Sequence, residues 1–234
     1  MSEKWTTAQM PSQAGRTAIV TGANSGLGLE TTAALAASGA RVIMACRNPA
    51  KAAAALETVR RRAPQADVAL MTLDLASLAS VRSFAAEFRR RHDTLDLLIN
   101  NAGILGVPLT RTVDGFENQM ATNHLGHFAL TGLLMPQLRT TPGARVVVVS
   151  SLAHRSGAHR LHDPNWERSR YSPAAAYGWS KLANLMFALE LQRRLDAAGT
   201  WPLDALGPWL SPPIRNTRSE ATGAWDVSGA LQYS

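Results

Sequence analysis

The sequence predicts an α/β fold, a doubly wound parallel sheet with helices on both faces. Two observations predict it: short apolar runs alternate with helical patterns, and the first run leads through a glycine-rich turn into a helix. Strands separated by helices at this spacing are joined by right-handed crossovers, which place the strands parallel in one sheet. We therefore expect one domain over residues 16–200, with a loose leader at 1–15 and a divergent tail at 201–234.

The first strand, at residues 17–21, turns sharply into a helix at residues 26–38. Glycines in such a turn allow a tight bend, a close backbone approach to a ligand, or close packing of helix on strand. The helix N-terminus then presents unpaired N–H groups and a positive dipole end to a phosphate. This opening makes the predicted fold Rossmann-like, although a plain strand–helix turn is the alternative that a lone glycine-rich stretch leaves open. The candidate cofactor contacts in the turn are Gly22, Asn24, Ser25, Gly26, Leu27 and Gly28.

The later elements follow from apolar runs and from residues that suit helix ends. Further strands are expected at residues 41–46, 68–73, 95–99 and 145–150. Further helices are expected at residues 51–62, 78–91, 115–134 and 173–197. Glycine suits the residue after a helix, serine suits an N-cap, and proline interrupts a helix. Accordingly, Gly39 should end the first helix, Ser77 should cap the third, and Pro136 should end the fourth.

The composition excludes several classes of protein. The chain has 234 residues, 46% of them hydrophobic, which suffices for a sizeable core. It contains no run of about 18 apolar residues, the length that predicts a membrane span. Residues 1–15 lack the apolar stretch of a secretory signal, and the single cysteine, Cys46, excludes an internal disulfide framework. We therefore expect a cytoplasmic protein.

The net charge of +7 raises the hypothesis of nucleic-acid binding. Two arginine triplets, at residues 60–62 and 89–91, contribute much of this charge. Each triplet closes a predicted helix, where cations complement the negative end of the helix dipole. Aromatic residues are only 6% of the chain and do not alternate with the arginines. We interpret the triplets as solvated helix ends and expect no specific nucleic-acid partner.

Tyr177 and Lys181 are four residues apart and therefore share one face of the last predicted helix. A phenol is a poor acid–base group at neutral pH because its pKa lies near 10, and lowering that pKa by about three units requires roughly 4 kcal/mol. An ammonium about 4 Å away stabilises the phenolate by a comparable amount at an effective dielectric constant of about 20. Lys181 is therefore sufficient to activate Tyr177, although the spacing alone also suits a core tyrosine beside a surface lysine.

Five segments, in this order, resemble the short-chain dehydrogenase/reductase family. They are the glycine-rich turn, Asn100-Asn101-Ala102-Gly103, Asn123, Ser150-Ser151 and Tyr177-x-x-x-Lys181. Asp163-Pro164-Asn165-Trp166 and residues 176–184 are similar to the retinol-dehydrogenase-like branch. The resemblance extends over residues 15–199 and implies hydride transfer between a nicotinamide and a carbonyl or alcohol substrate, small or lipophilic.

The resemblance also implies roles for individual residues. Tyr177 is the general acid or base, and Lys181 binds the nicotinamide ribose and tunes Tyr177. Ser151 holds the substrate oxygen, and Asn123 bends the long helix and helps to hold a water chain to the lysine. Further implied cofactor contacts are Asn101, Ala102, Gly103, Tyr177 and Lys181. From the residues alone, a simple cap at Ser151 and a surface residue or local bend at Asn123 stay open.

The end of the second strand predicts NADP(H) rather than NAD(H). An acidic residue there would favour NAD by hydrogen bonding to the ribose, whereas this chain has Arg47, which can pair with a 2′-phosphate. Alternatively, Arg47 only covers the end of the sheet. Asp74 and Leu75, after the third strand, resemble the segment of the family that contacts adenine, and Asp74 equally suits a cap ahead of Ser77.

We therefore expect an NADP(H)-dependent oxidoreductase, and the alternative is a dinucleotide-binding protein with little or no turnover. The histidines at 124, 127, 154, 159 and 162 lack carboxylate or cysteine partners, so no metal site is expected. The resemblance implies a homodimer or homotetramer. After Gly199 the family pattern is lost, and Pro208, Pro212 and Pro213 oppose regular structure. We expect a truncated or frame-shifted C-terminus that is poorly packed from about Trp201.

Overall fold

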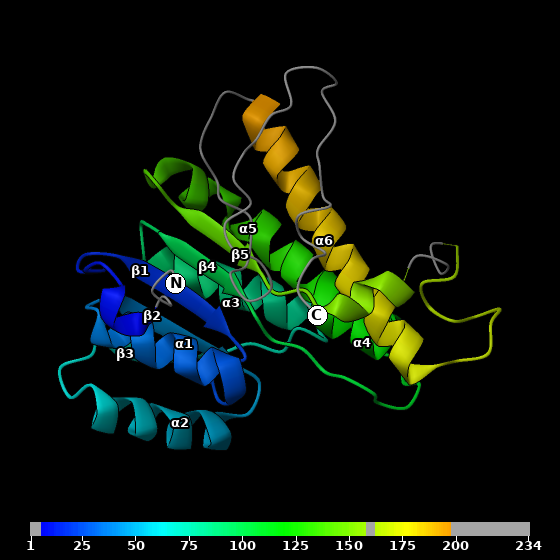
Figure 1. Ribbon diagram of the computed structural model, residues 1–234, viewed down its shortest axis with the longest axis horizontal. Helices are drawn as coiled ribbons and strands as arrows, with labels where there is room; N and C mark the ends of the chain where they lie inside the picture. Colours follow the sequence, from blue (N-terminus) through cyan, green and yellow to red (C-terminus); the bar gives the residue numbers. More distant parts are fainter. Residues whose placement is uncertain (1–5, 158–161, 198–234) are drawn as a thin grey trace, which may run out of the picture.

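The computed structural model describes residues 6–157 and 162–197. Five parallel strands form one sheet in the order β3-β2-β1-β4-β5 (Figure 1). The strands are β1 (Thr17–Thr21), β2 (Arg41–Cys46), β3 (Val68–Thr72), β4 (Leu97–Asn100) and β5 (Arg145–Val148). The predicted parallel α/β sheet is therefore confirmed. The tail from residue 201, with its predicted poor packing, lies outside the described residues.

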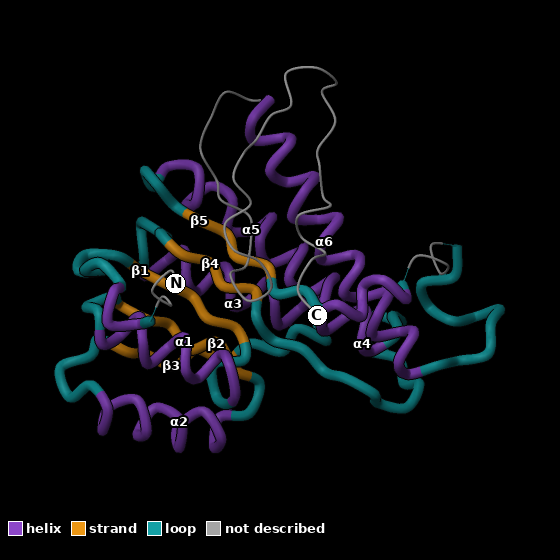
Figure 2. Tube along the Cα trace, viewed as in Figure 1, coloured by secondary structure: helices purple, strands orange, loops and turns teal. Residues whose placement is uncertain are grey.

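Helices cover both faces of the sheet, as the sequence predicted (Figure 2). On one face lie α1 (Gly26–Ala37) and α2 (Pro49–Arg62). On the other face lie α3 (Leu78–Arg91), α5 (Gly126–Thr140) and α6 (Pro173–Ala197). The shorter elements are η1 (Thr7–Gln9), α4 (Asn118–Met120), the π-helical η2 (Ala121–Leu125) and η3 (Leu152–Ser156).

Two hydrophobic cores form because successive side chains of a strand point to opposite faces of the sheet. In β1, Ile19 packs in the core beneath α3, α5 and α6, whereas Val20 packs in the core beneath α1 and α2. Both side chains are fully buried. A strand covered on both faces is continuously apolar rather than alternating. The apolar runs of the sequence could therefore locate the strands.

The fourth expected helix, at residues 115–134, differs from the structure. Helical structure begins at Asn118 and continues through Pro136 to Thr140, so the prediction that Pro136 ends this helix was wrong. Proline removes one backbone hydrogen bond from a helix. However, Leu134 and Leu138, on either side of Pro136, are fully buried. Burial of side chains of this size stabilises the helix by roughly 2 kcal/mol each, which offsets the lost hydrogen bond.

The strand ends also differ slightly from the expected bounds. β4 begins at Leu97 rather than at residue 95, and β5 ends at Val148 rather than at residue 150. Residues 149–151 consequently form the loop that leads to η3. This difference places Ser151 as the N-cap of η3, just beyond the carboxyl end of β5.

The arginine triplets at residues 60–62 and 89–91 form the last turns of α2 and α3. Cations are favourable there because they face the negative end of the helix dipole. Arg62 also forms an exposed ion pair with Glu30 of α1, at 2.9 Å. Within residues 6–157 and 162–197, no helix is both long and apolar enough to cross a membrane.

The order of the strands reverses between β1 and β4. From β1 the chain adds β2 and β3 on one side of the sheet, and it then returns to add β4 and β5 on the other side. In open parallel sheets, ligands bind at the carboxyl ends of the strands beside such a reversal. The fold thus brings the segments after β1, β4 and β5 together at one edge of the sheet.

Candidate active site

A pocket of about 460 Å³ lies at the carboxyl ends of β4 and β5. It is formed by α1, by the loops after β4 and β5, and by α6. The lining residues are Leu27, Asn101, Gly103, Ile104, Leu105, Val149, Ser150, Ser151, Leu152, Tyr177 and Lys181. The pocket therefore contains members of the glycine-rich turn, the loops after β4 and β5, and α6, but not Asn123 or the residues predicted at the ends of β2 and β3.

The glycine-rich turn has the backbone geometry that its sequence suggested. Gly22 has a φ of +65°, which side-chain-bearing residues rarely adopt, and a Cβ on it would lie 3.0 Å from Cβ of Ala102. A Cβ on Gly28 would lie 2.6 Å from Nδ2 of Asn101, so α1 packs directly against the loop after β4. Ser25 is the N-cap of α1, but its side chain accepts no hydrogen bond from the helix backbone. The first turn of α1 is thus left without a side-chain cap.

The loop after β4 is held to the end of β1 by hydrogen bonds. The side chain of Asn101 donates from Nδ2 to the carbonyl oxygen of Thr21, at 2.8 Å. The backbone N–H groups of Asn101 and Ala102 both donate to Oγ1 of Thr21, at 2.9 and 3.0 Å. These bonds fix the loop against the turn, so that Asn101 and Gly103 face the pocket.

Asn123 lies in the π-helical segment η2, between α4 and α5. Such segments widen a helix locally and are frequent at functional sites. Asn123 is fully buried, and its Oδ1 accepts from the N–H of Ile104 at 2.8 Å. Its Nδ2 donates to the carbonyl oxygen of Ile104 and to Oγ of Ser180. The side chain of Asn123 therefore ties the loop after β4 to α6, and this geometry excludes the surface position that the sequence left open.

Tyr177 and Lys181 share one face of α6, as their spacing predicted, and both line the pocket. Nζ of Lys181 lies 5.6 Å from the centroid of the Tyr177 ring. It also donates to the carbonyl oxygen of Val149, at 3.1 Å. Lys181 is only 3% exposed, and this burial lowers its pKa to about 8. The sequence did not suggest that the ammonium would be held by a backbone carbonyl from the end of β5.

The two serines after β5 have different surroundings. Oγ of Ser150 donates to the carbonyl oxygen of Lys181, at 2.8 Å, and so its proton is already used within the protein. Oγ of Ser151 accepts from the N–H of Ala153, at 3.2 Å, which leaves its own proton available to donate. Ser151 is thus both a cap, which the sequence had left open, and a possible donor to a ligand in the pocket.

The cofactor contacts predicted at the ends of β2 and β3 do not line the pocket. Arg47 is exposed at the end of β2 and has no hydrogen bond or ion pair to the described residues. Oδ1 of Asp74 accepts from the N–H of Ala76, while Ser77 is the cap of α3. Leu75 is buried, with 6% of its surface exposed. The side chain of Asp74 therefore stabilises the turn after β3, and Ser77 rather than Asp74 caps α3.

Two polar residues near this site, Asn184 and His127, were not among the predicted site residues. Asn184, one helical turn after Lys181, donates to the same Val149 carbonyl at 3.1 Å. His127 of α5 is buried and contacts Oγ1 of Thr21 through its Nε2, at 2.8 Å. The part of the chain that the structure describes holds no cluster of three histidine, cysteine or acidic residues able to bind a metal. The spacing of Asn184 from Lys181 could have identified it, whereas only the fold brings His127 to Thr21.

Known proteins share this sequence and this fold. The sequence pattern of the short chain dehydrogenase family matches residues 16–199. Retinol dehydrogenase 13 of Homo sapiens is 44% identical over 197 residues, which are 84% of this chain and 59% of that protein. Retinol dehydrogenase 12 of Mus musculus is 45% identical over 194 residues, 83% of this chain and 60% of that protein. This chain thus spans about three fifths of the length of these relatives.

Solved structures agree with these matches. The crystal structure of an uncharacterized protein from Mycobacterium Paratuberculosis has a TM-score of 0.76 and 50% identity, and the match covers 91% of this chain and 74% of that one. A Pseudomonas aeruginosa RhlG/NADP active-site complex has a TM-score of 0.65 and 28% identity, covering 86% of this chain and 75% of that one. The sequence pattern, the relatives and the sheet lead to one conclusion: this chain belongs to the short-chain dehydrogenase family.

Proposed function

We propose that this protein is an NADP(H)-dependent oxidoreductase that interconverts a carbonyl group and an alcohol in a small or lipophilic substrate. One observation carries the proposal: Ser151, Tyr177 and Lys181 line a single pocket next to the glycine-rich turn. A hydroxyl donor, a phenol and a buried ammonium are the groups that a carbonyl reduction needs. They would orient the oxygen, exchange its proton, and stabilise the charge that forms on the phenol.

The residues at the turn fit a dinucleotide. The absence of side chains at Gly22 and Gly28 lets the turn fold tightly against the loop after β4, and a Cβ on Gly26 would meet nothing within 4 Å, so the turn is open to a ligand there. The first turn of α1 has no side-chain cap at Ser25, so its N–H groups are available to a phosphate. Asn24, Gly26 and Leu27 complete this phosphate-binding segment. When bound, the nicotinamide would supply or accept the hydride.

The residues of α6 and η3 would handle the substrate oxygen. Tyr177 would donate a proton to this oxygen during reduction and accept one during oxidation. Ser151 would donate a hydrogen bond to the same oxygen and hold it in place, since its Oγ accepts from Ala153 and donates to no group among the described residues. Lys181 would stabilise the tyrosinate through its charge and bind the nicotinamide ribose. Asn123 would act indirectly, by holding the loop of Gly103 and Ile104 against α6.

The rim of the pocket supports an apolar substrate. Leu27, Leu105 and Leu152 line the pocket and are 48%, 66% and 46% exposed. Apolar side chains with this exposure gain free energy when a ligand removes them from water. Substrates with a lipophilic body should therefore bind more tightly than short polar ones of the same reactive group.

Titration and turnover together test the function. We expect quenching or enhancement of NADPH fluorescence on binding. We also expect oxidation of NADPH by lipophilic aldehydes and ketones, retinal among them, and reduction of NADP+ by the corresponding alcohols, retinol among them. Tyr177→Phe should lower turnover by roughly a thousandfold, because general acid–base catalysis contributes on that order, while NADPH binding stays nearly unchanged. Equal turnover in this variant would refute the role of Tyr177. Binding of NADPH without any turnover would instead favour the alternative of a non-catalytic dinucleotide-binding protein.

The choice of NADP(H) is tested separately. Arg47 is exposed at the end of β2, where a 2′-phosphate would lie, and a similar solved structure contains NADP in its active site. Arg47→Ala should weaken the binding of NADPH by about tenfold, because a charge-assisted hydrogen bond is lost, and should leave NADH binding unchanged. Arg89→Ala, which removes an exposed arginine at the end of α3, serves as the matched control. Equal losses for the two cofactors would refute this role of Arg47.

A further inference from the structure

The hydroxyl of Thr21 lies at the junction of β1, β4 and α5, just before the glycine-rich turn. Its Oγ1 is within hydrogen-bond distance of four groups. Two of these are donors, the backbone N–H groups of Asn101 and Ala102. The other two are Nε2 of His127, at 2.8 Å, and the carbonyl oxygen of Ile99, at 3.3 Å. A hydroxyl has one proton and two lone pairs, so the two acceptors compete for that proton.

The tautomer of His127 decides this competition. Nδ1 of His127 lies 3.0 Å from the carbonyl oxygen of Asn123, which can only accept a hydrogen bond. Nδ1 must therefore carry the proton, and in the neutral ring Nε2 is left as an acceptor. The Thr21 hydroxyl then donates to Nε2, the nearer of its two acceptors. Both lone pairs of Oγ1 are consequently free to accept from Asn101 and Ala102.

The surroundings of His127 keep the ring neutral at physiological pH. The side chain is 1% exposed, and burial lowers its pKa to about 4. The hydrogen bond to the Asn123 carbonyl opposes this shift, while the positive charge of Lys181 on α6 adds to it, as a charge on His124 of η2 would. Burial lowers the pKa of His124 as well. An imidazolium would place a third donor against Oγ1, in competition with the two backbone N–H groups that Thr21 now holds.

We propose that His127 is a positioning residue for the cofactor seat, which consists of the glycine-rich turn and the Asn101–Ala102 loop. Nε2 of His127 accepts a hydrogen bond from the Thr21 hydroxyl, and Thr21 in turn holds the loop against the turn. The inference rests on the proposed function, because it assumes that a dinucleotide binds at this turn and loop. The contact between loop and turn is close, since a Cβ on Gly22 would lie only 3.0 Å from Ala102. Rotation of the Thr21 hydroxyl away from the loop would therefore disturb the backbone on which the cofactor binds.

Two variants separate the role of the donor Nδ1 of His127 from the role of the acceptor Nε2. In His127→Asn the amide can replace Nδ1 as a donor to Asn123 but cannot reach Thr21. In His127→Gln the longer amide can offer its oxygen to Thr21 in place of Nε2. We expect His127→Asn to weaken NADPH binding by about tenfold, as for a buried group left unpaired, and to leave turnover at saturating NADPH nearly unchanged. His127→Gln should restore most of the affinity. A purely structural role would instead give equal losses in the two variants, and that result would overturn the inference.

A double-mutant cycle tests whether His127 acts through Thr21. Thr21→Val removes the hydroxyl and keeps the shape of the side chain, so it should also weaken NADPH binding. In the Thr21→Val background, His127→Asn should cost little more, because the two residues share one interaction. Additive losses would show that His127 acts by another route. His92→Asn, at the end of α3, is the control for the loss of a histidine elsewhere.

The wild-type protein provides a test that does not depend on the folding of any variant. Nitrogen NMR of the histidine rings should show a proton on Nδ1 of His127 and none on Nε2 at pH 7. A proton on Nε2 would overturn the inference even if the protein binds NADPH. By contrast, a wild-type protein that folds, shows the expected tautomer and binds neither NADPH nor NADH would refute the proposed function, and the cofactor seat with it.

Discussion

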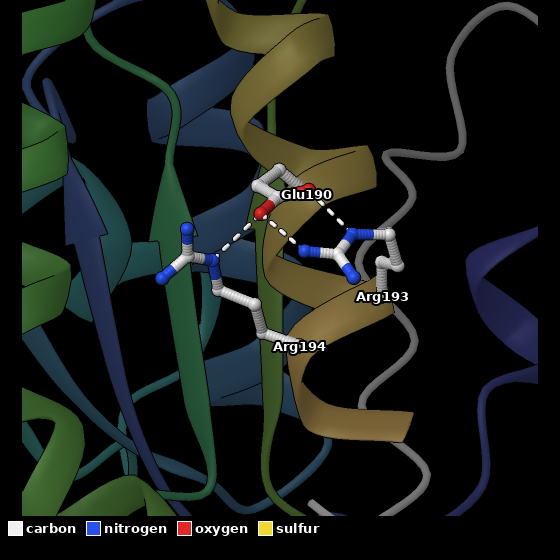
Figure 3. A network of polar contacts seen from close by, with 3 residues as sticks. All are labelled: Glu190, Arg193 and Arg194. Atoms are coloured by element: carbon white, nitrogen blue, oxygen red, sulfur yellow. Dashed lines mark hydrogen bonds and ion pairs between the residues drawn. The ribbon is translucent and has the colours of Figure 1, made fainter. Parts of the chain in front are cut away.

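The two ends of α6 both carry charged side chains, but their surroundings differ. Toward its N-terminal end, Lys181 is 3% exposed and its ammonium faces a backbone carbonyl and the ring of Tyr177. Toward its C-terminal end, the carboxylate of Glu190 accepts hydrogen bonds from Arg193 and Arg194 at 2.7–2.8 Å (Figure 3). These two arginines are 66% and 74% exposed. One helix thus contains a buried charge without a carboxylate partner among the described residues and a half-exposed charge with two partners.

The comparison shows that burial, rather than the number of partners, decides what a charge can do. Burial lowers the pKa of Lys181 to about 8. Hydrogen bonds from Arg193 and then Arg194 lower the pKa of Glu190 to about 2. Water and salt screen the exposed group, so its pKa shift contributes little to stability. The buried group interacts more strongly with its neighbours, because water screens it less. Chemistry is therefore expected at the first end of α6 and not at the second.

The largest effect is expected where buried polar groups would lose their partners. Asn123→Ala removes three hydrogen bonds from the buried end of the site and leaves the N–H of Ile104 without an acceptor. We expect the free energy of unfolding to fall by about 4 kcal/mol, measured by urea denaturation. Asn118→Ala, on the half-exposed face of α4, is the matched control and should cost less than about 1 kcal/mol. A similar loss in the two variants would contradict the contrast between buried and exposed polar groups.

A smaller effect, which depends on pH, is expected from Lys181. Its pKa in the folded protein is about 8, below the ordinary 10.5, so the unfolded chain binds more protons between these values. The free energy of unfolding should therefore rise with pH across this window, by up to about 3 kcal/mol, and should be constant below it with respect to this group.

Lys181→Met keeps the length of the side chain and removes its charge. The variant should lack this rise, whereas Lys51→Met, at an exposed position of α2, should retain it. Urea denaturation of all three proteins between about pH 7.5 and about pH 10 measures how the free energy of unfolding depends on pH. This range begins near the pKa of Lys181 in the folded protein and ends below its ordinary value. An identical pH dependence in the wild type and Lys181→Met would contradict the burial of the ammonium.

The smallest effect is expected at the other end of α6. Because the pKa of Glu190 is lowered, its contribution to stability is present above its ordinary value of 4.5 and is lost as the pH falls toward about 2. Glu190→Gln should lower the melting temperature at pH 7 by at most about 2 °C, and added salt should remove the difference. A decrease in melting temperature larger than the one caused by Asn123→Ala would contradict the expected order of the two effects.

Helix ends show where local sequence is a sufficient guide and where it is not. Ser77 caps α3 as predicted, because a cap depends on the hydrogen bond of one side chain to its own helix. Pro136 does not end α5, because Leu134 and Leu138 are buried against other elements of the fold. Propensity describes the isolated segment, and it is overridden when packing supplies more free energy.

The candidate site shows the same division. The glycine turn, Asn123, Ser151 and the Tyr177–Lys181 pair could be found from the sequence because each has a characteristic spacing or context. The spacing did not reveal the Val149 carbonyl that holds Lys181, or the proton arrangement of Thr21 and His127. Those partners are distant in the sequence, and a backbone carbonyl has no residue type that would mark it.

The sequence by itself determined the alternation of strands and helices, the glycine-rich turn and the face of α6 that carries Tyr177 and Lys181. These features depend on interactions within a few residues, which apolar periodicity, glycine positions and helical spacing record directly. Only the tertiary structure decided that α5 continues past Pro136, that Ser151 rather than Ser150 has a proton to donate, and that His127 reaches Thr21. These outcomes depend on burial and on hydrogen bonds between separate elements, which exist only once the chain has folded.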